Sequence, residues 1–256
     1  MQKICVISSS RADYGIMSNL IKKIQKHKDF KLNLIITGSH LSKKFGFTSN
    51  EIVKDGIAIN KKIYLKDNKN YYENISYLIN KYSKVIKKIN PKIIILLGDR
   101  YEIFAAAISS YLRRIPIGHI HGGEVTSGSM DEGFRHSITK LSYLHFAATN
   151  KSQKRILQLG EKKNRVFNIG SLSLENIKKI KFLTMSQIEK KYNTKLKKKV
   201  AFVVFHPNTV DVNHDVLNIN KILPIYYRII FTLEPFLMIR LNELFLRLTF
   251  HFHRYV

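Results

Sequence analysis

The chain has 256 residues, of which 45% are hydrophobic, so it is long and apolar enough to bury the core of one large domain or two smaller ones. This composition is that of a globular protein, and a single cysteine, Cys5, excludes a scaffold built on intramolecular disulfides. Cys5 lies in an apolar run, where we expect a buried side chain. No signal peptide is visible after Met1, and the expected compartment is the cytoplasm.

The formal net charge of +26 raises the question of nucleic-acid binding. Lysines within residues 75–89 mostly fall between apolar positions with helical spacing, which predicts one solvated helix face rather than a phosphate-binding surface. Lysine is also spread over most of the chain, with few aromatic residues interleaved to stack on bases. We therefore expect no nucleic-acid partner.

Short apolar, β-branched runs recur along the chain, and most of the gaps between them are long enough for a helix. The runs comprise residues 3–8, 32–37, 92–97, 115–120, 144–148, 165–169 and 200–205. This alternation predicts parallel strands joined by helical crossovers, and the unbroken apolar run at residues 93–97 is typical of a strand covered on both faces. The predicted fold class is α/β, with a doubly wound, Rossmann-like parallel sheet.

Polar residues gather directly after these predicted strands. In a doubly wound sheet, ligands bind beyond the carboxyl ends of the strands, so chemistry is expected in these segments. They are residues 8–15, 37–41, 98–100, 119–124 and, a little later, 131–136. The first is a hydroxyl-rich turn with Arg11 at the start of the next helix, and such a turn can offer backbone N–H groups and a guanidinium to a phosphate.

Four carboxylates lie in or after these segments, together with three arginines. The acids are Asp99, Glu124, Asp131 and Glu132, and the arginines are Arg11, Arg100 and Arg135. A sugar diphosphate site requires cations that bind the phosphates and carboxylates that transfer protons, and this edge of the sheet can supply both. For Asp131 and Glu132 a simpler explanation stays open, since acids are favoured in the first turn of a helix.

Histidines and glycines in the same segments have both structural and functional interpretations. His119 and His121 are spaced like some metal ligands, but no further Cys or His cluster completes a coordination shell, and we expect no metal. The glycine pair at residues 122–123 predicts a close backbone approach or a positive φ angle, unless it only forms a tight loop. His40, like His206, follows an apolar strand and is either a ligand contact or a structural histidine.

Taken together, these segments resemble the hydrolysing UDP-N-acetylglucosamine 2-epimerases of sialic acid biosynthesis. The resemblance rests on residues 10–15, 37–41, 98–100, 119–124, 131–140, 170–171 and 205–207. It implies two Rossmann-like domains facing each other across a cleft, the glycosyltransferase-B architecture, and no metal or redox cofactor. We therefore expect an N-terminal Rossmann-like domain at residues 1–170 and a partial, aberrant C-terminal domain at residues 171–256.

The resemblance also implies a reaction and its residues. UDP is eliminated across C1 and C2 of the sugar to give a 2-acetamidoglucal, and water then adds to release N-acetylmannosamine and UDP. By motif position, Asp99, Glu124 and Asp131 match acids implicated in proton transfer and in stabilising the glycosyl cation. The implied substrate-binding residues are Arg11, His40, Arg100, Arg135, Ser171 and His206. The implied partner is a UDP-sugar, and an intact family member is expected to be a homo-oligomer.

The resemblance decays after residue 209, and the composition changes with it. Lysine occurs 32 times in residues 1–207 and once in residues 208–256, and no glycine follows Gly170. The family's second domain needs a glycine-containing loop to hold the UDP phosphates, so this domain is expected to be incomplete, as a frameshift or premature stop would leave it. The alternative is a natural amphipathic or membrane-associating tail, because four arginines after residue 222 are set among aromatic residues.

Other functions stay open at this point. A 2-epimerase for UDP-2,4-diacetamido-6-deoxy sugars, in the legionaminic acid route, would use the same motifs. An inactive, truncated nucleotide-sugar-binding remnant is favoured by the glycine-free tail. A glycosyltransferase of the same architecture would not be expected to carry Asp99, Glu124 and Asp131 together at these strand ends.

Overall fold

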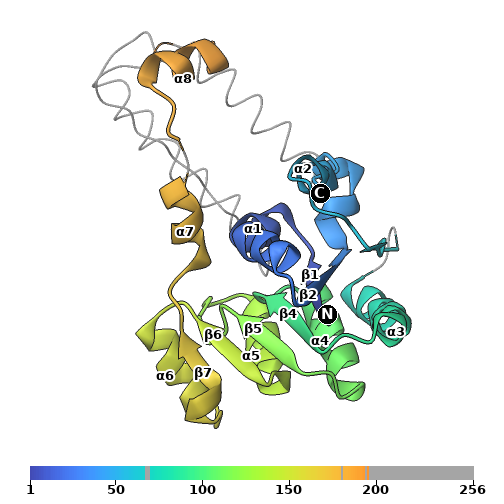
Figure 1. The fold of residues 1–256 in the computed structure, drawn as a ribbon. Coiled ribbons are helices and arrows are strands. Elements are labelled where there is room, and N and C mark those ends of the chain that lie inside the picture. Colours follow the sequence, from blue (N-terminus) through green and yellow to red (C-terminus); the bar gives the residue numbers. More distant parts are fainter. Residues whose placement is uncertain (67–69, 180, 194, 196–256) are drawn as a thin grey trace. The chain divides into compact units, whose positions relative to one another are not determined.

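The computed structural model of the chain describes residues 1–66, 70–179, 181–193 and 195. A seven-stranded sheet lies within them, with the strand order β3-β2-β1-β4-β5-β6-β7 and parallel pairing between all neighbours (Figure 1). The strands are β1 (Gln2–Ser8), β2 (Phe30–Ile36), β3 (Lys61–Lys62), β4 (Ile93–Leu97), β5 (Ile117–Ile120), β6 (Leu144–Ala147) and β7 (Val166–Asn168). This is the doubly wound, Rossmann-like sheet that the apolar runs predict.

Helices connect the strands, and several of them begin at a residue whose side chain caps the first turn. They are α1 (Arg11–Lys26), α2 (Ser49–Lys54), α3 (Tyr71–Ile89), α4 (Tyr101–Leu112), α5 (Met130–Leu141), α6 (Asn150–Gln158), α7 (Leu172–Lys179) and α8 (Met185–Tyr192). Ser10 caps α1 by accepting a hydrogen bond from the N–H of Asp13. Asn70 and Glu73 form a reciprocal capping box at the start of α3. The first helical turns are therefore encoded locally.

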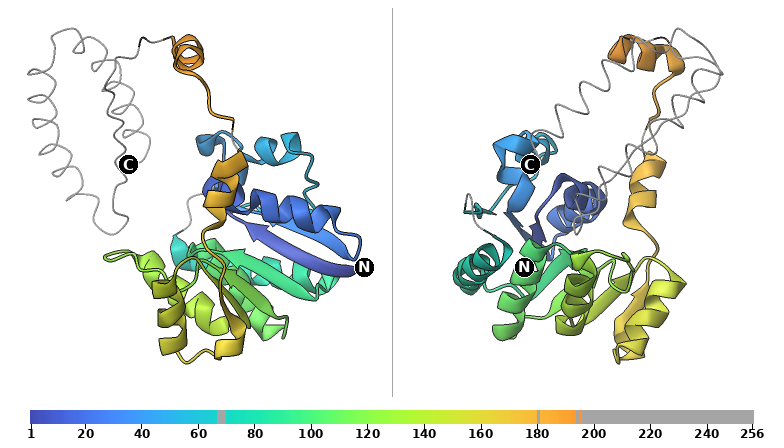
Figure 2. Two further views of the ribbon diagram at one scale, coloured as in Figure 1. Left: turned by 60° about the vertical axis from the view of Figure 1, so that its left-hand side comes forward. Right: turned by 180° about the vertical axis from the view of Figure 1, so that it is seen from behind.

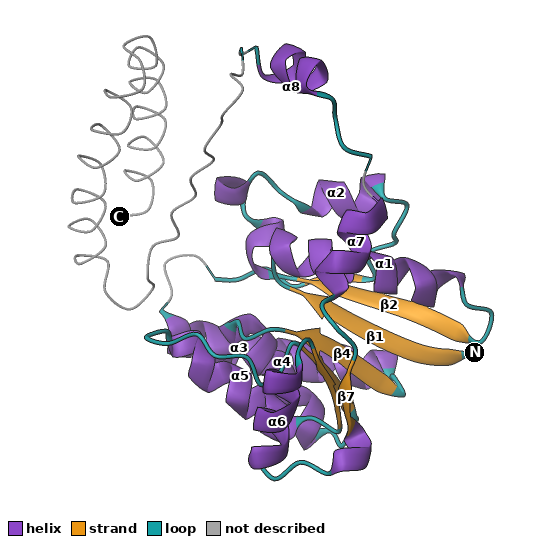
Figure 3. Ribbon diagram, turned by 90° about the vertical axis from the view of Figure 1, so that its left-hand side faces the viewer, coloured by secondary structure: helices purple, strands orange, loops and turns teal. Residues whose placement is uncertain are grey.

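The central strands are buried on both faces because their side chains alternate between two hydrophobic clusters. Cys5 and Ile7 of β1 pack with α3, α4 and α5, whereas Ile4 and Val6 pack on the opposite face with α1 and α2. Figure 3 shows the strands lying between these two groups of helices. Cys5 has no exposed surface, which confirms its expected burial.

Six of the seven predicted strands are confirmed, with ends that move by at most two residues. The seventh, at residues 200–205, lies outside the described residues. Strand β3 was not predicted, because its two lysines carry no apolar pattern. It exists through pairing alone, with Ile35 opposite Lys61 and the N–H of Ile63 donating to the carbonyl of Ile36 at 2.9 Å. Among the described helices, none is both long and apolar enough to cross a bilayer.

Helix α7 follows β7 and returns to pack beside α1 (Figures 1 and 2). Lys23 Nζ and Glu175 form an ion pair at 2.9 Å, and Asn176 Nδ2 donates to the carbonyl of Gly15 at 2.5 Å. All of the described residues belong to one compact unit. The domain boundary at residue 170 stays a prediction.

Candidate functional site

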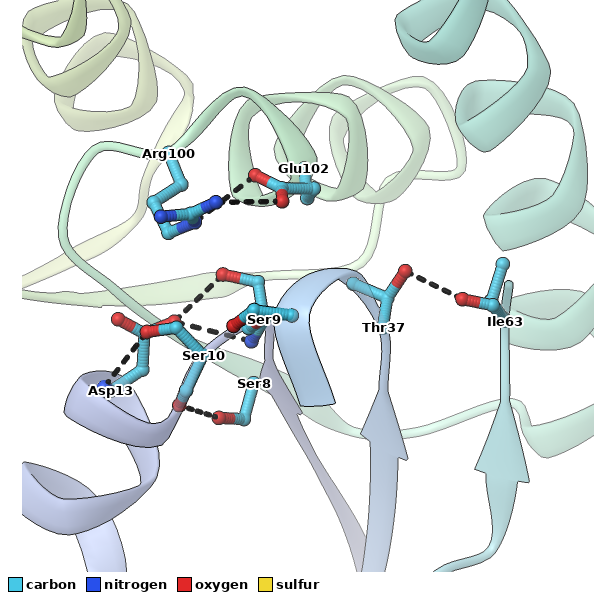
Figure 4. A network of polar contacts seen from close by, with 9 residues as sticks. Ser8, Ser9, Ser10, Asp13, Thr37, Ile63, Arg100 and Glu102 are labelled. Atoms are coloured by element: carbon cyan, nitrogen blue, oxygen red, sulfur yellow. Dashed lines mark hydrogen bonds and ion pairs between the residues drawn. The ribbon is translucent and has the colours of Figure 1, made fainter. Parts of the chain in front are cut away.

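The carboxyl ends of β1, β2, β4 and β5 meet at one edge of the sheet, and the predicted polar segments follow them. The residues of the hydroxyl-rich turn after β1 form hydrogen bonds with one another (Figure 4). The N–H and the hydroxyl of Ser9 donate to Asp13 Oδ2 at 3.1 and 2.7 Å. Asp13 is only 7% exposed, and the sequence analysis did not single it out. The sequence signal that could have identified Asp13 is its spacing from Ser10, which is typical of the start of a helix. The N–H of Ser9 is therefore engaged within the protein rather than offered to a phosphate.

Arg100 is held by a buried carboxylate that the sequence analysis also missed. Its guanidinium donates twice to Glu102, with distances of 3.2 Å from Nε and 3.0 Å from Nη2 (Figure 4). The Glu102 side chain is 1% exposed and that of Arg100 is 41% exposed, so the pair presents a fixed cation at the surface. Glu102 and the carbonyl of Ser9 also lie against Gly38, whose φ is +59°.

Asp99 and Arg135 form an ion pair, although 36 residues separate them in the chain. Asp99 follows β4 and Arg135 lies on α5, so the tertiary fold brings the two side chains into contact. Burial raises the pKa of Asp99, and Arg135 offsets only part of this effect, while the nearby Asp131 adds to it. A raised pKa is a common property of carboxyl groups that exchange protons in active sites.

Asp131 and Glu132 lie in the first turn of α5, as the simpler explanation of the sequence requires. The N–H of Asp131 donates to the hydroxyl of Ser129, which caps the helix, at 3.2 Å. Glu132 instead pairs with His136 one turn later, at 3.6 Å. Of these two acids, Asp131 is the one that raises the pKa of Asp99, as does Asp13. Both roles of Asp131, at the helix start and near Asp99, are therefore compatible.

Glu124 and His121 form a second polar pair, on the loop after β5. His121 Nδ1 lies 3.2 Å from Glu124 Oε1, and this hydrogen bond is the main cause of a lowered pKa for Glu124. His121 has a φ of +63°, an uncommon value for a residue with a side chain. Gly123 also has a positive φ, and a Cβ there would lie 2.4 Å from the carbonyl oxygen of Ser152. The predicted close backbone approach therefore exists, but to the protein itself.

His119, the neighbour of His121 in the predicted histidine pair, has a different environment. It is completely buried, with Nε2 2.8 Å from the carbonyl oxygen of Gly98 and Nδ1 3.1 Å from Thr139 Oγ1. Burial lowers the pKa of His119 to about 3. In the described part of the chain, no group of three His, Cys, Asp or Glu side chains is arranged to hold a metal ion. His119 ties the ends of β4 and β5 to α5.

Arg11 and His40, two further predicted substrate-binding residues, make contacts of their own. Arg11 is exposed, pairs with Glu51 at 3.0 Å and lines a surface pocket with residues of α1 and α2. His40 is completely buried, and its ring nitrogens lie 2.9 Å from Ser8 Oγ and 2.9 Å from Thr48 Oγ1. This geometry favours the structural interpretation of His40. Ser171 directly precedes α7, and His206 lies outside the described residues.

The fold and this edge define a Rossmann-like α/β protein with carboxylates and arginines at the carboxyl ends of its strands, where ligands bind in such sheets. Comparison with known proteins makes the class more specific. The family model described as UDP-N-acetylglucosamine 2-epimerase matches residues 22–235, and the chain belongs to this family.

Individual relatives support the same assignment. The chain is 39% identical over 226 residues to the GDP/UDP-N,N'-diacetylbacillosamine 2-epimerase (hydrolyzing) of Campylobacter jejuni, which covers 87% of this chain and 59% of that protein. It is 39% identical over 214 residues to polysialic acid biosynthesis protein P7 of Escherichia coli, covering 82% of this chain and 54% of that protein. The chain therefore spans little more than half the length of these relatives.

A solved structure shows the same fold. The UDP-GlcNAc 2-epimerase from Neisseria meningitidis bound to UDP-GlcNAc superposes with a TM-score of 0.63 at 24% identity, covering 74% of this chain and 52% of that chain. This similarity confirms the predicted Rossmann-like sheet of the epimerase and glycosyltransferase-B type.

Proposed function

We propose that the chain is the nucleotide-sugar-binding part of a hydrolysing 2-epimerase that converts UDP-N-acetylglucosamine to N-acetylmannosamine and UDP. The observation that carries the proposal is the ion pair of Asp99 and Arg135, in which burial raises the pKa of the carboxyl group. Family membership supplies the type of reaction. The proposed division is a binding domain at residues 1–170 and an incomplete second domain at residues 171–256.

The proposed chemistry needs a proton acceptor at C2 and cations for the diphosphate. Departure of UDP builds positive charge at C1 and makes the C2 proton far more acidic. A nearby carboxylate can therefore stabilise the charge at C1 or assist the removal of the C2 proton. Asp99, Glu124 and Asp131 are the proposed acids. Arg100, whose guanidinium donates two hydrogen bonds to Glu102, is the proposed cation for a phosphate oxygen. Arg135 is proposed to act beside Asp99.

The other proposed contacts differ in how directly they face a ligand. Arg11 is proposed as a nucleotide contact, because its exposed guanidinium lines a pocket. His40 is proposed to position the turn after β1 through its hydrogen bond with Ser8. Ser171 and His206 keep their proposed roles by family resemblance alone. For an intact family member, a homo-oligomer is the proposed assembly.

A UDP-diacetamido sugar is the second candidate substrate. The relative from Campylobacter jejuni is named for N,N'-diacetylbacillosamine, and so is a Legionella pneumophila protein that is 34% identical over 217 residues. Contacts to the substituents at C4 and C6 of the sugar would distinguish this substrate from UDP-N-acetylglucosamine. Incubating the 256-residue chain with each UDP-sugar, and analysing the products by NMR, tests both candidates.

Asp99→Asn is expected to reduce kcat for UDP release by about 10²–10⁴-fold, because the variant removes a proton-exchanging group and keeps its shape. The matched control is Asp29→Asn, which changes an exposed carboxylate that pairs only loosely with His27, at 3.9 Å. Full activity of Asp99→Asn would contradict the assignment of the acids. UDP binding without turnover in the unmodified chain would instead support the nucleotide-sugar-binding remnant.

A further inference from the structure

The two ring nitrogens of His121 differ in their partners. Its Nδ1 lies 3.2 Å from Glu124 Oε1, and among the residues that the structure describes no partner reaches Nε2, although that atom is buried. Buried polar atoms without a partner are rare in proteins, and each one calls for a physical explanation. A ligand group that completes the site is such an explanation.

The Glu124 pairing determines which ring nitrogen carries the proton. An ionised carboxylate can only accept hydrogen bonds, so Nδ1 of His121 must be the donor. In the neutral ring, Nε2 then carries the lone pair and is a base. A carboxylate that fixes a histidine in this tautomer also stabilises the imidazolium ion that forms when Nε2 takes a proton.

The loop around His121 is fixed on several sides. The N–H of His121 donates to the carbonyl of Phe146 at 3.0 Å, and Arg155 donates to the carbonyl of Gly123. A Cβ on Gly122 would lie 2.9 Å from Nδ1 of His119 and 3.0 Å from Thr139 Oγ1, so only glycine fits there. His121 is therefore held at its positive φ by its surroundings, as strained residues at functional sites are.

We propose that His121 removes the C2 proton of the bound UDP-sugar, with Glu124 as its positioning residue; this inference rests on the proposed function. In this step the C2–H bond breaks and its electron pair becomes the second bond between C1 and C2. The C1–O bond breaks and its electron pair leaves with UDP. The proton goes to Nε2 of His121, and the resulting imidazolium is paired with the Glu124 carboxylate.

The charged and titratable groups that interact with His121 are Glu124 on its own loop and His119 on β5. Arg135 on α5 acts on both of these groups and forms the ion pair with Asp99 after β4. Glu124 is the one that hydrogen-bonds to His121. The His121 contribution to the reaction must therefore be isolated by substitution.

The test is NMR of the full chain labelled with ¹⁵N at histidine, with the His121 signals assigned by their loss in His121→Gln. We expect the neutral His121 ring of the free protein to carry its proton on Nδ1, beside Glu124. Titration with UDP-N-acetylglucosamine should shift the Nε2 signal, and UDP alone should shift it much less, because only the sugar reaches His121. His27→Gln is the control, since His27 pairs with Asp29 outside the proposed site.

Each outcome decides between the two claims. A proton on Nε2 in the free protein, or UDP-N-acetylglucosamine binding that moves Nε2 no further than UDP does, would overturn the inference and leave the proposed function standing. Failure of the chain to bind either compound would overturn both. If the unmodified chain converts the substrate, His121→Gln should lower kcat by about 10²–10⁴-fold with little change in KM. A normal kcat in this variant would overturn the inference.

Discussion

Acidification from pH 6.5 to about 4.5 should remove about 2 kcal/mol of stability through His119 alone, because each pH unit between its folded and unfolded pKa values is worth at most about 1.4 kcal/mol. Burial lowers the pKa of His119 from 6.5 to about 3. The folded chain therefore keeps His119 neutral while the unfolded chain takes up a proton. Stability is fully present above pH 6.5 and declines as the pH falls toward the folded value.

The measurement is urea unfolding at a series of pH values for the unmodified chain and for His119→Gln. Far-UV circular dichroism is the suitable signal, since the chain has no tryptophan. His40 and His145 also have lowered pKa values through burial and act in the same direction, whereas the raised pKa values of Asp99 and Glu102 act in the opposite direction. The difference in slope between the two proteins isolates His119, and equal slopes would contradict its buried, neutral state.

Gly38→Ala should destabilise the fold by about 2–5 kcal/mol, which combines the cost of a left-handed backbone with that of overpacking. Gly38 has a φ of +59°, and a Cβ there would lie 2.6 Å from the carbonyl oxygen of Ser9 and 2.7 Å from Glu102 Oε1. Neither atom can retreat easily, since one is backbone and the other is a buried carboxylate that holds Arg100.

Gly160→Ala is the matched control for this substitution. Gly160 also has a positive φ, of +86°, but a Cβ there would meet nothing within 4 Å. Its variant should therefore show only the backbone cost, about 1–2 kcal/mol. Thermal and urea unfolding of both variants would give the comparison. Equal losses for the two variants would show that the space between the turn after β1 and Glu102 is not tight.

The fold could be predicted from the sequence where burial dictates composition. Strand β4 is an unbroken apolar run because helices cover both of its faces, and such runs stand out against a lysine-rich background. Strand β3 has no such signal, since two edge lysines form it only through pairing with β2. Local pattern cannot reveal an element that depends on its neighbour.

The candidate site could be predicted only in outline. The rule that ligands bind at the carboxyl ends of parallel strands brings Asp99 and Arg135 to one edge, and the structure places them in contact. The pairing of Glu102 with Arg100 was not predicted, because an acid in the first turn of a helix has an ordinary explanation. The different environments of His119 and His121 could not be predicted either, since they depend on a change of backbone conformation directly after β5.

Cys5 gives this chain a built-in reporter. It is the only cysteine, it lies in the central strand β1 without exposed surface, and burial raises its pKa to about 12. Thiol reagents attack the thiolate, so the native sheet shields this sulfur both sterically and chemically. A maleimide should therefore label the unmodified chain only when β1 is uncovered. A fluorophore attached to a cysteine introduced at the surface would mark that position alone, with no need to remove the natural thiol.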